Sequence, residues 1–168
     1  MSYESQTLPS AGRLKDVQIL VVDNDADSRC LYKTVLEIYG AQVTTVESIA
    51  DAMTLLDYLV PDILVCEIRF FNEDVLPLIQ RIKAVALGQG QRIPILVASA
   101  SCAVSFAQKL LPLVDDYLLK PVDVNHLVDD VWNLVHLAKA GKAVNIQDWV
   151  LKHKDWAKYH ATATTHPH

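Results

Sequence analysis

The sequence predicts an α/β domain in which a central parallel sheet carries helices on both faces. Short apolar runs alternate with segments of helical periodicity, and turn residues separate the two kinds of segment. Three of the apolar runs, at residues 19–22, 63–66 and 95–98, are almost uninterrupted. Uninterrupted apolar runs are typical of parallel strands that are buried on both sides, so these strands are expected to lie inside the domain.

The individual elements follow in a regular order along the chain. Ser48 is a suitable N-cap for the second helix, and Gly40 is a suitable stop for the first. Five repeats of a strand followed by a helix predict a doubly wound, five-stranded parallel sheet. The strands are expected at residues 17–22, 42–47, 62–67, 93–98 and 116–119, and the helices at about 27–39, 49–59, 74–87, 102–111 and 124–139.

One more helix is predicted after these repeats, at residues 146–159. Asn145 is its expected N-cap, and Trp149 and Trp156 belong to an apolar stripe along it. The chain therefore divides into three parts: an N-terminal arm at 1–16, the α/β domain at 17–139, and a C-terminal helical extension and tail at 140–168.

Composition and charge exclude several classes of function. The hydrophobic content of 51% supports a well-buried core, and no apolar run approaches the roughly 20 residues that span a bilayer. Because the first residues are polar, we expect a cytoplasmic protein without a membrane partner. Residues 1–138 hold 10 basic and 18 acidic side chains, a net charge of −8, whereas residues 139–168 hold 5 and 2, a net charge of +3. The acidic body argues against direct nucleic-acid binding, which needs a basic face.

The three cysteines, Cys30, Cys66 and Cys102, are widely separated, and each lies within an apolar or helical stretch. An odd number with this spacing argues against a disulfide framework and against a zinc site. They are expected to be buried thiols.

Polar side chains mark the carboxyl ends of four predicted strands. They are Asp23, Asn24 and Asp25 after the first strand, Glu67 at the end of the third, Ser99 after the fourth and Lys120 after the fifth. Doubly wound folds bring these strand ends into one crevice. Carboxylates, a hydroxyl and an ammonium group together suit a hard cation and a phosphoryl group, because Mg²⁺ prefers oxygen ligands and phosphate is bound by lysine and hydroxyl donors.

Four segments around these residues resemble the receiver domains of two-component response regulators, a family with a flavodoxin-like fold. The segments are residues 19–25, 61–68, 93–100 and 116–121, and the resemblance covers roughly residues 17–139. It implies that the acidic turn binds Mg²⁺, that an Asp ending the third strand accepts phosphate from a histidine kinase, and that Ser99 and Lys120 bind the phosphoryl oxygens. It also implies that Tyr117, three residues before Lys120, is the aromatic residue that changes rotamer on activation.

The sequence departs from the family at the position that accepts phosphate. Glu67 stands where the family has Asp, and its additional methylene group moves the carboxylate outward by roughly 1.5 Å, the length of one C–C bond. Asn24 replaces the second acid of the turn and removes an anionic ligand, so Mg²⁺ binding at Asp23 is expected to be weak or absent. Phe70 and Phe71 replace the Met-Pro pair that follows the acceptor in the family and make the adjacent loop bulkier. These departures suggest that the phosphorylation step has been lost.

Several side chains have two interpretations from the sequence alone. Glu67 is either a fixed negative charge that mimics the phosphorylated acceptor or simply the ion-pair partner of Lys120. Asp23 and Asp25 either hold a cation or favour the N-terminus of the first helix through its dipole. Tyr117 is either a switch or a packed aromatic residue, and Ser99 either contacts phosphate or caps a helix.

The favoured function is that of an atypical, stand-alone receiver, not an enzyme, that acts through phosphorylation-independent protein contacts. Its expected partner is a histidine kinase, a regulator or a second copy in a homodimer, and its expected contact surface includes Phe106, Trp149 and Trp156. The alternative is a conventional phosphorylated response regulator. A nucleotide-using enzyme is disfavoured because no Gly-rich loop follows any strand, and a DNA-binding output is disfavoured because a single helix follows residue 139.

Overall fold

A parallel sheet of five strands forms the centre of the domain. The computed structural model describes residues 12–100 and 108–141. The elements are β1 (Gln18–Val22), α1 (Ala26–Ile38), β2 (Gln42–Val46), α2 (Ile49–Leu55), β3 (Ile63–Cys66), α3 (Leu76–Gly88), β4 (Ile95–Ser99), the 3₁₀ turn η1 (Leu111–Leu113), β5 (Asp116–Leu119) and α5 (Val124–Lys139).

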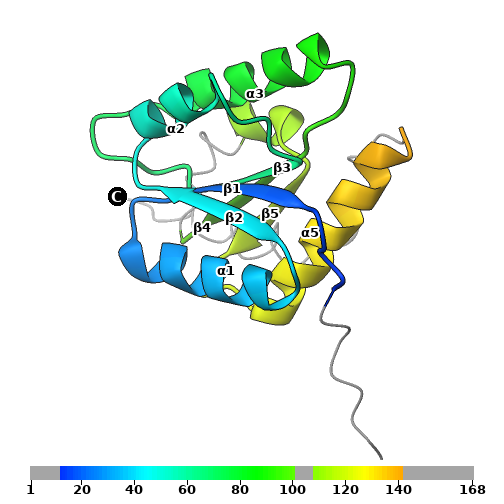
Figure 1. Ribbon diagram of the computed structural model, residues 1–168. Helices are drawn as coiled ribbons and strands as arrows, with labels where there is room; N and C mark the ends of the chain where they lie inside the picture. Colours follow the sequence, from blue (N-terminus) through cyan, green and yellow to red (C-terminus); the bar gives the residue numbers. More distant parts are fainter. Residues whose placement is uncertain (1–11, 101–107, 142–168) are drawn as a thin grey trace, which may run out of the picture.

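The strands are arranged in the order β2-β1-β3-β4-β5, and every neighbouring pair is parallel. Helices α2 and α3 cover one face of the sheet, and α1 and α5 cover the other (Figure 1). The fold class predicted from the sequence is therefore confirmed. Because the strand order reverses at β1, the carboxyl ends of β1 and β3 flank the point at which doubly wound folds carry their functional site.

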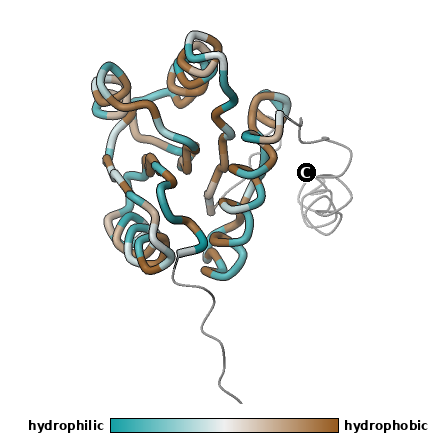
Figure 2. Tube along the Cα trace, turned by 45° about the vertical axis from the view of Figure 1, so that its right-hand side comes forward, coloured by the Kyte–Doolittle hydropathy of each residue, from teal (hydrophilic) through white to brown (hydrophobic). Residues whose placement is uncertain are grey.

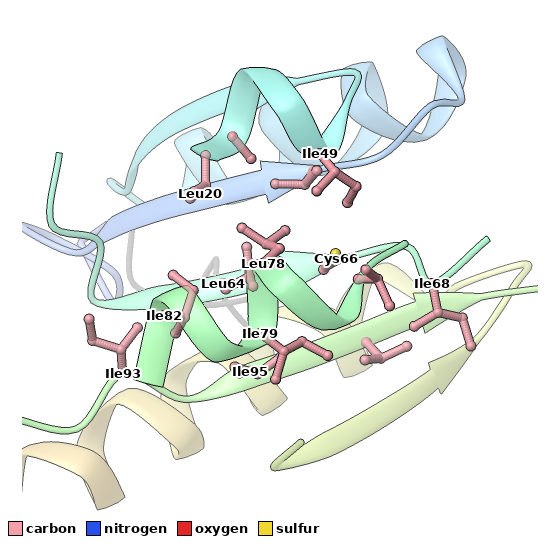
Figure 3. Packing of buried hydrophobic residues seen from close by; sticks show 14 of the residues in the cluster. Leu20, Ile49, Leu64, Cys66, Ile68, Leu78, Ile79, Ile82, Ile93 and Ile95 are labelled. Atoms are coloured by element: carbon pink, nitrogen blue, oxygen red, sulfur yellow. The ribbon is translucent and has the colours of Figure 1, made fainter. Parts of the chain in front are cut away.

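Two apolar clusters fill the space between the sheet and its helices. Successive residues of a strand point to opposite faces, so Leu20, Leu64 and Ile95 pack under α2 and α3, whereas their neighbours pack against α1 and α5. Figure 3 shows the first cluster, in which side chains of α3 meet those of the strands. In Figure 2 brown and teal alternate around the helices, as expected of amphipathic helices that cover a buried sheet.

Local capping explains where the first two helices begin and end. The side chain of Asp25 accepts a hydrogen bond from Ser28 N at the start of α1, and Ser48 accepts one from Asp51 N at the start of α2, as predicted. Gly40 follows the end of α1 with φ 96°, a conformation that glycine adopts without strain.

The predicted boundaries agree closely with the structure except at α2. This helix ends at Leu55 instead of residue 59, because residues 56–58 form a turn whose amide groups still reach Ala52, Thr54 and Leu55. Of the helix predicted at 102–111, only residues 108–111 are described: 108–110 are helical, and Leu111 begins η1. The helix predicted at 146–159 lies outside the described residues.

The prediction that all cysteines are buried is wrong for Cys30, which is exposed. On α1 the buried positions are Tyr32 and Leu36, four residues apart on one side of the helix, and Cys30 lies two residues from Tyr32 on another side. Cys66 is buried as predicted, and burial raises the pKa of its thiol. Cys102 lies outside the described residues.

The residues immediately before β1 pack on the α1 and α5 side of the sheet. Leu14 is fully buried in the second cluster, and its amide group donates to Tyr39 O over 2.8 Å. Arg13 pairs with Asp129 at 2.6 Å, and its guanidinium lies 5.1 Å from the centre of the Trp132 ring. Part of the segment that the sequence assigned to an N-terminal arm is thus packed against the domain.

Candidate functional site

The side chains predicted to converge do meet at the carboxyl edge of the sheet. Asp23 follows β1, Glu67 follows β3, and Lys120 follows β5, and the lysine joins the two acids. The neighbouring register of β1 with β3, and of β4 with β5, brings these strand ends together. Residues that are 97 positions apart in the sequence thereby become hydrogen-bond partners.

Lys120 is the centre of this cluster. Its Nζ lies 2.8 Å from Asp23 Oδ2 and 3.0 Å from Glu67 Oε2. The side chains of Asp23 and Glu67 are only 1% and 7% exposed, and that of Lys120 is 16% exposed. The pair with Glu67 was predicted from the sequence, whereas the pair with Asp23 was not. One ammonium group thus sits between two buried carboxylates.

The second carboxylate oxygen of Glu67 is held by the backbone of its own loop. Oε1 accepts hydrogen bonds from Ile68 N at 2.7 Å and from Arg69 N at 3.1 Å. Asn24 donates from Nδ2 to Arg69 O over 3.2 Å, which connects the acidic turn to the same loop. Two amide groups of the loop after β3 therefore hold this carboxylate oxygen in place.

The acidic turn offers a poor donor set for a divalent cation. Asp23 already contacts Lys120 through Oδ2 and Asp25 N through Oδ1, the latter over 2.8 Å. Asp25 Oδ2 accepts from both the amide and the hydroxyl group of Ser28, at 3.0 and 2.6 Å, and serves as the N-cap of α1. Asn24 contributes no charge. Mg²⁺ prefers anionic oxygen ligands, and here the Asp23 carboxylate is already paired with the ammonium group of Lys120.

The electrostatic environment matches this geometry. Burial opposes the charge of Lys120, but its hydrogen bonds with Asp23 and Glu67 outweigh burial and raise the pKa of the lysine above its usual value. Burial raises the pKa of Asp23, an effect that the hydrogen bond from Lys120 only partly offsets. Hydrogen bonds from Ser28 lower the pKa of Asp25.

Ser99 and Tyr117 belong to the neighbouring strands β4 and β5. Ser99 is the last residue of β4 and is 1% exposed, and its carbonyl group accepts from Lys120 N over 3.0 Å. Tyr117 is 4% exposed and belongs to the apolar cluster under α2 and α3. Tyr117 is therefore packed in this structure, and its role as a switch remains a prediction.

The sequence did not reveal how firmly the loop after β3 is attached to its surroundings. The carboxylate of Glu73 accepts from Ile49 N at 3.1 Å and from Ala50 N at 2.9 Å, at the start of α2. Phe70 packs against the first apolar cluster, whereas Phe71 is 90% exposed. Only one of the two phenylalanines therefore adds bulk to the buried side of the loop.

The remaining predicted contact residues, Phe106, Trp149 and Trp156, lie outside the described residues. Within residues 12–100 and 108–141, no cluster of three or more His, Cys, Asp or Glu side chains forms a metal-binding group. None of the helices in the same part of the chain is long and apolar enough to cross a membrane.

With this geometry established, comparison with known proteins identifies the class. Residues 19–131 match the model of the response regulator receiver domain, and the chain belongs to this family. The CheY-like receiver domain of Methanospirillum hungatei superposes with a TM-score of 0.68 at 16% identity, over 74% of this chain and 98% of the other. At this level of identity the likeness concerns the fold alone.

Two bacterial relatives illustrate the range of sizes in which this domain occurs. An uncharacterized 14.6 kDa protein from Leptolyngbya boryana is 34% identical over 116 residues, which cover 68% of this chain and 87% of the relative. The Regulator of RpoS from Escherichia coli is 30% identical over 152 residues, which cover 89% of this chain but 42% of the relative. The chain is thus a receiver domain of the two-component signalling class, a class that works through contacts with proteins such as kinases and regulators.

Proposed function

We propose that this receiver signals without a phosphorylation cycle and acts as a stand-alone protein-binding module. The observation that carries the proposal is the position of Lys120 Nζ, 3.0 Å from Glu67 Oε2 and 2.8 Å from Asp23 Oδ2. The lysine that binds the phosphoryl group in the family is here joined to a built-in carboxylate. The permanent negative charge of Glu67 therefore takes the place of the phosphoryl group that would be added and removed in a phosphorylation cycle.

Phosphoryl transfer to Glu67 is opposed by the contacts of both of its oxygens. One oxygen faces the ammonium group of Lys120, and the other accepts two backbone hydrogen bonds. A carboxylate that acts as a nucleophile would have to give up part of this stabilisation before attack. The 7% exposure of the side chain also leaves little room for a donor to approach.

The proposed mode of action does not require Mg²⁺. In phosphoryl transfer, metal ions neutralise the charge that develops on the phosphoryl oxygens. Here Lys120 already contacts both Asp23 and Glu67, and Asn24 donates its amide group to Arg69 O. We therefore propose that the protein functions without a bound cofactor.

The output of such a module is a protein contact, with a histidine kinase, a regulator or a second copy as its partner. Lys120 adjoins β5, which forms an edge of the sheet and carries Leu119 with 41% exposure. The pairing at Lys120 fixes the end of this edge strand next to the start of α5. A surface made by β5 and its neighbours is thus held in one state.

A conventional phosphorylated regulator is the second candidate, and one specific observation favours it. Ser99 and Lys120, the two residues that would bind phosphoryl oxygens, are both in place at the ends of β4 and β5. The two candidates differ in what sets the conformation of the domain: the permanent charge at position 67 in the first, and an added phosphoryl group in the second.

This difference is tested by recording the backbone amide NMR spectrum of the whole chain. We expect acetyl phosphate with Mg²⁺ to leave the wild-type spectrum unchanged. Glu67→Gln is expected to shift the amides of Ser99, Lys120 and the start of α5, because it weakens the pairing that fixes them. A Mg²⁺-dependent shift of those amides in the wild type after addition of acetyl phosphate would favour the conventional regulator.

A further inference from the structure

A groove lies at the amino edge of the sheet, at the end opposite Lys120. It consists of two hollows, of about 250 and 460 Å³, that share Ala86, Leu87, Gln91, Arg92 and Ala138 in their walls. Residues that precede β3, β4 and β5 line it, as do the last turns of α3 and α5. The ends of these two helices lie on the same side of the domain in Figure 1.

The groove has an apolar floor and a polar margin. Ile93, Pro94 and Leu134 are buried side chains of its wall, and Leu87 at the end of α3 is 84% exposed. Leu87 thus presents apolar surface beside the hollow, and burying that surface would be favourable. Lys83, Arg92 and Asp115 provide charges of both signs around the first hollow.

The described chain ends at this groove. Lys139 and Gly141 line the second hollow, and Gly141 adopts φ 68° while its amide group donates to Ala138 O over 3.2 Å. A residue with positive φ after the last helical turn ends α5 and turns the chain away from the helix axis. Gly141, the last described residue, therefore lies in the groove wall.

The sequence beyond Gly141 contains a segment that could occupy this groove. Its 27 residues include a predicted amphipathic helix at 146–159. The apolar stripe of this helix consists of Ile146, Trp149, Val150 and Trp156. The five residues from 142 to 146 span at most about 16–18 Å, enough to reach either hollow from Gly141.

We propose that the segment 146–159 docks into this groove of its own chain through Trp149 and Trp156. Tethering favours this occupant over a second copy, because a short linker holds a segment near its site at roughly millimolar effective concentration. The indole rings would cover Leu87 and fill the hollows, while Asp155 and Lys158 remain on the polar side of the helix. The docking is independent of the chemistry at Glu67.

The test is an amide NMR comparison of the full chain with Trp149→Asp/Trp156→Asp and with Leu87→Glu. Both changes are expected to shift the amides of residues 86–93 and 134–141. The Leu87→Glu change is also expected to move Trp fluorescence emission to longer wavelength, because the two indoles become solvated. Since Leu87 is 84% exposed, its replacement leaves the core intact. Matched controls are Ile38→Glu, at a 64% exposed position on α1, and Lys158→Ala, on the polar side of the predicted helix; neither should produce these changes.

The outcomes separate the possible occupants. Groove shifts that do not depend on protein concentration, in a protein that tumbles as a monomer, support docking within one chain. Shifts that grow with concentration together with slower tumbling would assign the groove to a second copy and overturn the proposal. The proposal would also be overturned if the groove amides of the Trp149→Asp/Trp156→Asp variant kept the NMR chemical shifts of the wild type.

Discussion

Replacing Lys120 with Met is expected to lower the free energy of unfolding by about 3–5 kcal/mol, because it removes the cation between two buried carboxylates. The side chain of Asp23 is 1% exposed and that of Glu67 is 7% exposed, so water cannot replace the lost partner effectively. Glu67→Gln should be milder, roughly 1–2 kcal/mol, because the amide oxygen still accepts from the loop and Lys120 retains Asp23. Denaturant unfolding monitored by circular dichroism measures both changes.

A matched control is Lys33→Met, which removes an exposed lysine paired with Glu37 at 3.5 Å on one face of α1. An exposed pair of this spacing is worth only about 0.3–0.5 kcal/mol. If Lys120→Met and Lys33→Met proved equally mild, the buried cluster would contribute no more than a surface ion pair. Lys120 would then not be the cation that stabilises the buried carboxylates of Asp23 and Glu67.

The pH dependence gives an independent check on the same variant. The pKa of Lys120 is raised above its usual 10.5, so the stabilisation from its proton is complete below that value and is lost as the pH rises through the folded-state pKa. The difference in free energy of unfolding between the wild type and Lys120→Met should therefore become smaller at alkaline pH. The same difference should also narrow at acidic pH, because burial raises the pKa of Asp23 and protonation of this carboxyl removes a buried charge that the variant leaves unpaired. A constant difference at all pH values would contradict the assignment.

Combining Glu67→Asp with Asn24→Asp is expected to convert an inert site into one that accepts phosphate. The shorter side chain withdraws the carboxylate by roughly 1.5 Å, and the added acid supplies an anionic ligand for Mg²⁺. Ser99 and Lys120 are already positioned at the ends of β4 and β5. After treatment with acetyl phosphate and Mg²⁺, intact mass spectrometry should detect one added phosphoryl group in the double variant.

The single variants serve as controls for this conversion. Asn24→Asp alone should remain unlabelled because Glu67 is still in place, and Glu67→Asp alone should label less than the double variant. If the double variant folds but stays unlabelled, neither the length of the side chain at position 67 nor the missing Mg²⁺ ligand at position 24 is what prevents phosphorylation. Replacement of Phe70, which packs beside the loop, would then identify a steric block.

The sheet could be predicted because parallel strands that are buried on both faces appear in the sequence as uninterrupted apolar runs. The apolar runs of β1, β3 and β4 and the Asp116–Leu119 strand fall where the sequence indicated, and α5 has the predicted bounds. The alternation of strands and helices then fixed which side chains share the carboxyl edge. The convergence of Asp23, Glu67 and Lys120 follows from topology alone.

The details of the site depend on distances that sequence order does not contain. An ammonium group near two acids can pair with either, and only the structure shows that Lys120 reaches both. The contacts of Glu73 with the start of α2 join a loop to a helix 24 positions earlier, without any motif to reveal them. Leu14 is a similar case, because a single apolar residue in a polar segment has no periodicity to indicate burial.

The measurement that tests the central claim most directly is the intact mass of the wild-type protein after incubation with acetyl phosphate and Mg²⁺. Because Glu67 is engaged by Lys120 and by two amide groups of its own loop, we expect no increase in mass. The gain of one phosphoryl group, abolished by Glu67→Gln, would contradict the account and identify the protein as a conventional regulator.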